Sequence, residues 1–143
     1  MNSASPSAAK AQLIRDFLRL TGIQRKIDDG GFFDKFCIPG GAVFMALPGD
    51  VLYGEAFTVA KAAISAAYEE HRSVWQDEYD SHVNWEFDEG ELGEIVAFLS
   101  SPAGKHYQEG LWRMGAYIGT NTEHLIDEIL QKACAIASAH TAS

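Results

Sequence analysis

The chain has 143 residues and a formal net charge of −9, and hydrophobic residues make up 47% of it. That length suits one hydrophobic core, and the apolar content argues against intrinsic disorder. Between Asp50 and Glu94 there are twelve acidic and two basic residues. An acidic middle of this density repels phosphate backbones, so we expect no nucleic-acid binding.

No apolar run approaches the ~20 residues that cross a bilayer, so we expect no membrane span. The polar start also lacks the apolar segment of a signal peptide. As written, the chain is expected to be cytoplasmic; a periplasmic location is the alternative if a signal peptide has been removed. Cys37 and Cys134 match no metal-binding spacing. They would be free thiols in the cytoplasm, and after export they could form one disulfide.

The small polar residues 1–7 predict a disordered tail, followed by a single helical domain over residues 8–143. A first helix is expected from about Ala8 to Thr21 and ends at Gly22. Its apolar face contains Leu13, Ile14, Phe17, Leu18 and Leu20. Residues 23–37 predict a second helix that is interrupted at Gly30 and Gly31. Proline and glycine clusters in residues 38–53 fit a short hairpin, a buried loop or a helical continuation.

A long helix is expected from about Glu55 to Trp85, with a kink near Glu70. At about 100° per residue, Trp75, Tyr79 and His82 share a narrow arc of this helix. Together with Trp112 they are the candidate lining of an apolar ligand-binding cleft. The alternative is that this arc is a core stripe with part-buried histidines.

Asp88 and Glu91 have the spacing of a capping box, which predicts a helix start. Leu92, Ile95, Val96 and Leu99 then recur on one face. Ser101 and Pro102 predict the end of that helix and the N-cap and first residue of the next.

The last helix is expected to run from Pro102 to about Ser138. Its predicted buried stripe comprises Leu111, Met114, Ile118, Leu125, Ile129 and Ile136. Gly110, Gly115 and Gly119 each cost about 1 kcal/mol relative to alanine, which predicts a kink or a close helix contact near residues 115–120, and a break is expected there.

The central motif, Phe-x3-Glu-Leu-x2-Ile-x2-Phe-Leu-Ser-Ser-Pro-Ala-Gly-Lys from Phe87 to Lys105, resembles the signature of the bacterial "domain of unknown function 2059" family. Residues 11–22 are similar to the opening helix of that family, whereas the Pro- and Gly-rich residues 38–52 depart from its pattern. The resemblance implies an all-α fold and frequent export to the periplasm or envelope. It brings no catalytic residues.

We therefore expect an all-α protein, an irregular bundle of about five helices with a long C-terminal helix. The favoured function is a non-catalytic binding or protein-interaction module, a homodimer through its long amphipathic helices, with an apolar small molecule or a protein as partner and with no cofactor. One alternative is a metal-assisted hydrolase that uses Glu78 and His82 together with His124 and Glu128. The other alternative is a structural component of the envelope.

Overall fold

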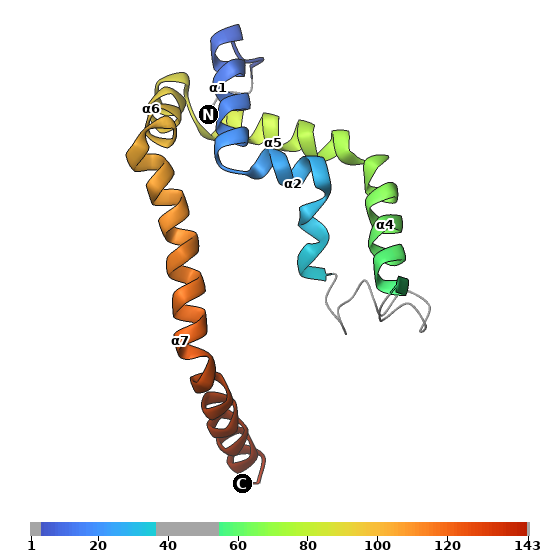
Figure 1. Cartoon of the computed structure of the whole chain (residues 1–143). Helices are drawn as coiled ribbons and strands as arrows, with labels where there is room; N and C mark the ends of the chain where they lie inside the picture. Colours follow the sequence, from blue (N-terminus) through green and yellow to red (C-terminus); the bar gives the residue numbers. More distant parts are fainter. Residues whose placement is uncertain (1–3, 37–54, 143) are drawn as a thin grey trace. The chain divides into compact units, whose positions relative to one another are not determined.

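The computed structural model describes residues 4–36 and 55–142 of the chain, and within these ranges the regular structure is helical throughout (Figure 1). The elements are α1 (Ala8–Leu20), α2 (Ile23–Asp29), the 3-10 helix η1 (Gly31–Phe36), α4 (Glu55–Glu69), α5 (Arg72–Glu86), α6 (Glu89–Ser100) and α7 (Pro102–Thr141). The prediction of an all-α fold with a long C-terminal helix is confirmed.

The chain divides into two compact units, Met1–Ser100 and Ser101–Ser143. The first unit contains α1 to α6, and the second is α7 with its flanking residues. A single helix has no hydrophobic core of its own, so the second unit does not meet the definition of a separate domain. The prediction of one domain over residues 8–143 stays a prediction.

The core of the first unit forms where α1 packs against α5 and, most extensively, against α6. Ile14 and Leu18 lie one turn apart on α1 and meet Val83 of α5 and Leu92 of α6. The partly buried residues around them are Leu13, Phe17, Ile23, Tyr79 and Phe87. The apolar face predicted for the first helix is therefore the face that is buried.

The residues before α1 contact the rest of the first unit. The hydroxyl of Ser7 accepts a hydrogen bond from the Lys10 amide at 3.1 Å and donates one to Oε1 of Glu89 at 2.7 Å. The carbonyl of Ala4 accepts a bond of 2.9 Å from Nδ2 of Asn84. Residues 1–3 of the predicted tail lie outside the described residues.

The helix predicted from Glu55 to Trp85 is two helices. α4 ends at Glu69, and α5 begins at Arg72 in a different direction (Figure 1). The amide of His71 donates to the carbonyl of Tyr68 at 2.8 Å, a three-residue bond that closes the last turn of α4. The kink expected near Glu70 is thus a complete break.

The helix start predicted at Asp88 is confirmed by its hydrogen bonds. Oδ1 of Asp88 accepts from the Glu91 amide at 2.8 Å, and Oε2 of Glu91 accepts from the Asp88 amide at 3.0 Å. Ser101 is the N-cap of α7 and accepts from the Gly104 amide at 3.0 Å, with Pro102 at the first helical position. Both predicted caps are present.

Replacing Asp88 with alanine should lower the free energy of unfolding by about 1 kcal/mol, because the Glu91 amide loses its acceptor. Urea denaturation followed by circular dichroism measures the change. Asp88→Asn is the matched control, since the asparagine amide oxygen can still cap the helix. Equal destabilisation by both substitutions would show that the cap contributes nothing.

α7 runs without interruption for 40 residues. The break predicted near residues 115–120 is wrong, and so is the assignment of its apolar stripe as buried, since Ile118 is 58% and Ile129 62% exposed. Glycine lowers helix stability but retains its N–H, so the hydrogen-bond ladder continues through it, unlike at proline. The hydroxyls of Thr120 and Thr122 donate to carbonyls four residues earlier and leave the helix intact.

Two expectations fall on undescribed residues. The hairpin or loop in residues 38–53 and the pairing of Cys37 with Cys134 lie outside the described ranges, although Cys134 itself is exposed. Across residues 4–36 and 55–142, no helix combines the length and the apolarity required to span a membrane.

Candidate functional site

Trp75 and Tyr79, two of the four predicted cleft residues, belong to an aromatic cluster in the first unit. The Trp75 ring lies edge-on to Tyr68, with 5.2 Å between centroids, and 6.1 Å from Phe33. Tyr79 stacks on Phe32 at 5.7 Å. Both side chains are half-buried, so part of their ring surface is used to pack α5 against the η1 segment.

Tyr68 fixes the centre of this cluster. Its hydroxyl donates to the carbonyl of Ile27 at 2.7 Å. Burial raises the pKa of Tyr68, while the nearby Arg72 guanidinium acts in the opposite direction. The phenol therefore remains protonated and continues to donate. Its ring covers Gly30, where an added Cβ would lie 3.0 Å from Cδ1 of Tyr68.

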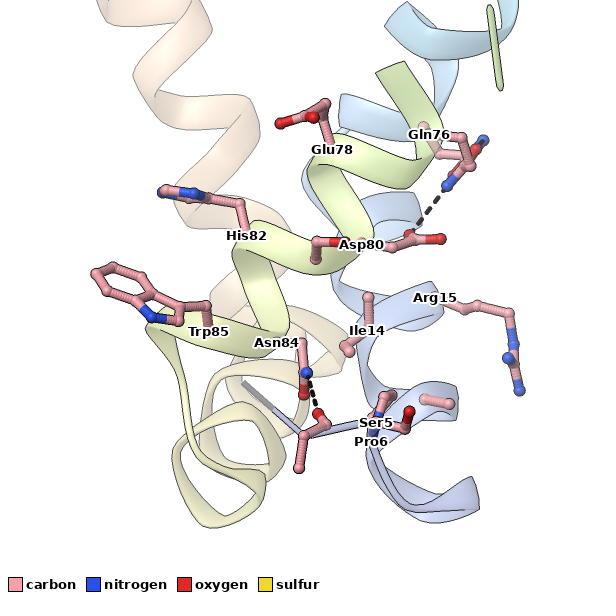
Figure 2. A pocket seen from close by; sticks show the side chains of 14 residues that line it. Ser5, Pro6, Ile14, Arg15, Gln76, Glu78, Asp80, His82, Asn84 and Trp85 are labelled. Atoms are coloured by element: carbon pink, nitrogen blue, oxygen red, sulfur yellow. Dashed lines mark hydrogen bonds between the residues drawn. The ribbon is translucent and has the colours of Figure 1, made fainter. Parts of the chain in front are cut away.

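His82, the third predicted cleft residue, is exposed and lies 5.8 Å, between ring centroids, from Trp85. Both line an open pocket of about 1060 Å³ between the N-terminal segment, α1 and α5. Figure 2 shows Glu78, His82 and Trp85 on one side of α5, with Gln76 and Asp80 on the other. These polar side chains do not point at a common position, so the pocket presents no assembled catalytic group.

Lys10 and Asn84 form a buried polar contact beside this pocket that the sequence patterns did not predict. Nζ of Lys10 donates to the Asn84 carbonyl at 2.8 Å, in the last turn of α5, where a cation is favourable for the helix dipole. Oδ1 of Asn84 is buried and has no partner among the described residues. The sequence contains one sign that Lys10 is buried, because Lys10 lies on the same face of α1 as Ile14 and Leu18.

The residues of the hydrolase alternative are divided between the units: Glu78 and His82 lie on α5, and His124 and Glu128 lie on α7. In the part of the chain that the structure describes, no three His, Cys, Asp or Glu side chains are grouped so as to hold a metal ion. The geometry adds no support to the hydrolase.

Trp112, the fourth predicted cleft residue, belongs to the second unit and is 75% exposed. It is one of many such residues on α7. Of the fourteen large hydrophobic side chains that are exposed in the described residues, eleven lie on this helix. They are Tyr107, Leu111, Trp112, Met114, Tyr117, Ile118, Leu125, Ile126, Ile129, Leu130 and Ile136. Apolar surfaces of this extent are rare on monomeric proteins.

Comparisons of the chain with protein-family models, with curated proteins and with solved structures found no match.

Proposed function

We propose that the chain is a non-catalytic protein-interaction module, that α7 is its binding element and that it forms a homodimer through this helix. The observation that supports the proposal is the concentration of exposed large hydrophobic side chains on α7. The apolar residues from Leu111 to Ile136 follow the period of the helix, so they share one face of it. Such a face binds another protein surface or helix more readily than it binds a small polar substrate.

The energetics of a single helix favour a partner. A solvated helix gains little from propensity alone, and most helical stability in proteins comes from packing of an apolar face. α7 also includes Gly110, Gly115 and Gly119, and each of these glycines lowers the stability of the helix by about 1 kcal/mol relative to alanine. Its ion pairs, Glu109 with Arg113 at 3.6 Å and Glu128 with Lys132 at 3.0 Å, are exposed pairs of i and i+4 spacing. Each contributes only about 0.3–0.5 kcal/mol, so covering the stripe is the larger source of stability.

Replacing Ile118 with glutamate should raise the dissociation constant of the homodimer at least tenfold, because the carboxylate would have to be buried in the apolar contact. Analytical ultracentrifugation over a range of concentrations measures the constant. Ala116→Glu is the matched control, since it adds the same charge on the opposite face of α7. Equal effects of the two substitutions would contradict a contact through the stripe.

Membership in the "domain of unknown function 2059" family, and the periplasmic location that it implies, stay proposals that rest on the motif from Phe87 to Lys105. A small-molecule site around Trp75 and Tyr79 is less well supported than the interaction surface, because their rings pack against Tyr68, Phe33 and Phe32.

A further inference from the structure

We propose that two copies of the chain pair through α7 in antiparallel orientation, with the two-fold axis passing between Glu123 and His124. This inference rests on the proposed self-association and specifies its geometry. In this register, a residue of one copy lies level with a residue of the other copy when their two numbers add up to 247. Glu123 and His124 are one such pair.

The first argument is the symmetry of the stripe. From Leu111 to Ile136 the residues on this face are separated by 3, 4, 4, 3, 4, 4 and 3 positions, an order that reads the same in both directions. A two-fold contact needs a surface that complements itself. The proposed register sets Leu111 level with Ile136, Met114 with Ala133, Ile118 with Ile129 and Thr122 with Leu125. The spacing repeats every 11 residues, which favours nearly straight helices with a slight right-handed twist.

Thr122 is the polar residue at the centre of this face, and its polar group is already satisfied. Its hydroxyl donates to the carbonyl of Ile118 in the same helix at 2.6 Å. The side chain can therefore present its methyl group to Leu125 of the other copy without burying an unpaired donor.

The glycines of α7 provide the second argument. A Cβ at Gly115 or Gly119 would meet nothing within 4 Å in the chain itself, so the packing of one copy does not require glycine there. On a helical wheel both lie on the same flank of the stripe as Ile126 and Leu130. In the antiparallel register Gly119 lies two residues, or about 3 Å along the axis, from Ile126 of the other copy, and Gly115 lies equally close to Leu130. A large side chain thus meets a residue without one, and the glycines allow a close approach.

The distribution of charge also distinguishes the two orientations. Residues 102–121 contain Lys105, Glu109 and Arg113, a net charge of +1; residues 122–141 contain Glu123, Asp127, Glu128 and Lys132, a net charge of −2. Antiparallel pairing sets the positive half of each helix beside the negative half of the other. Parallel pairing would set like halves together, which is less favourable.

The area available is sufficient for a stable contact. Eight large side chains lie on the stripe and its flank, and each is between 40% and 72% exposed. At roughly 180 Å² for one large side chain, they expose on the order of 800 Å² per copy. Stable interfaces bury about 800 Å² per partner, so the contact between two α7 helices reaches that size.

The test is a pair of distance measurements by double electron–electron resonance on the full chain, with Cys37 and Cys134 replaced by serine. One variant carries a spin label at Glu109→Cys and the other at Asp127→Cys. Both positions lie opposite the stripe, so the labels leave the contact undisturbed. In the proposed register the two labels at position 109 are offset by 29 residues (247 − 2 × 109), and those at position 127 by 7 (2 × 127 − 247). With a rise of about 1.5 Å per residue, axes about 10 Å apart and labels that project about 8 Å outward on the far side of each helix, the expected distances are about 50 Å and about 30 Å.

Each other outcome overturns the register. Short distances of about 30 Å at both positions would show a parallel pair. Any other pair of distances, equal or unequal, would show an antiparallel pair centred elsewhere. In both cases the homodimer proposal survives. The absence of dipolar coupling at both positions, at concentrations where ultracentrifugation finds a single chain, would overturn the register together with the proposed function.

Discussion

Replacing Leu92 with alanine should lower the free energy of unfolding by about 3 kcal/mol, within the range of Leu→Ala substitutions in well-packed cores. Leu92 is fully buried and belongs to the cluster of Ile14, Leu18 and Val83. α1 and α6 pack together more extensively than any other pair of helices in the first unit, so the cavity would open at their contact. Urea denaturation monitored by circular dichroism measures the loss.

Val74→Ala is the control for this substitution. Val74 lies in the same unit, on α5, and is 55% exposed. Its truncation should change the stability by less than about 0.5 kcal/mol, as for most exposed positions. If Leu92→Ala were as mild as Val74→Ala, the core at the α1 and α6 contact would be wrongly placed.

Gly30→Ala should lower the stability of the first unit by roughly 2–5 kcal/mol. Gly30 has φ = 73°, a left-handed conformation that costs a residue with a side chain roughly 1–2 kcal/mol. The new methyl group would also press against Tyr68, whose ring cannot easily move because its hydroxyl is bonded to Ile27. Overpacking of this kind costs about 1–3 kcal/mol more.

Gly22 offers a matched control, because its φ of 79° is similar and a Cβ there would meet nothing within 4 Å. Gly22→Ala should carry the backbone cost alone, so the difference between the two variants isolates the contact with Tyr68. Chemical denaturation of both proteins under the same conditions gives that difference. A value near zero would contradict the packing of Tyr68 over Gly30.

The features that could be predicted from the sequence are local. Asp88 with Glu91, and Ser101 with Pro102, are close in the chain, and their capping bonds span three residues. The buried faces of α1 and α6 also follow from helical periodicity. Near Glu70 the sequence predicted a kink in one helix, and the structure has two helices.

The features that could not be predicted depend on contacts between residues far apart in the sequence, or on the sum of several small contributions to the free energy of folding. The burial of Lys10 depends on the end of α5, more than seventy residues away, where the Asn84 carbonyl accepts a hydrogen bond from its ammonium group. Glycine content suggested a break in α7, but three modest penalties do not outweigh a continuous hydrogen-bond ladder. For the candidate site, periodicity located the apolar stripe of α7, yet a period reports which residues share a face and not what covers it. The stripe was therefore expected to be buried within the chain, and in the structure it is exposed.

Sedimentation equilibrium of the unmodified chain, over concentrations from below micromolar to about 100 µM, tests the proposed self-association most directly, since interfaces of this size have dissociation constants from micromolar to picomolar. The homodimer proposal predicts a mass of twice 15.6 kDa at the upper concentrations. A mass of 15.6 kDa throughout the range would contradict self-association through α7.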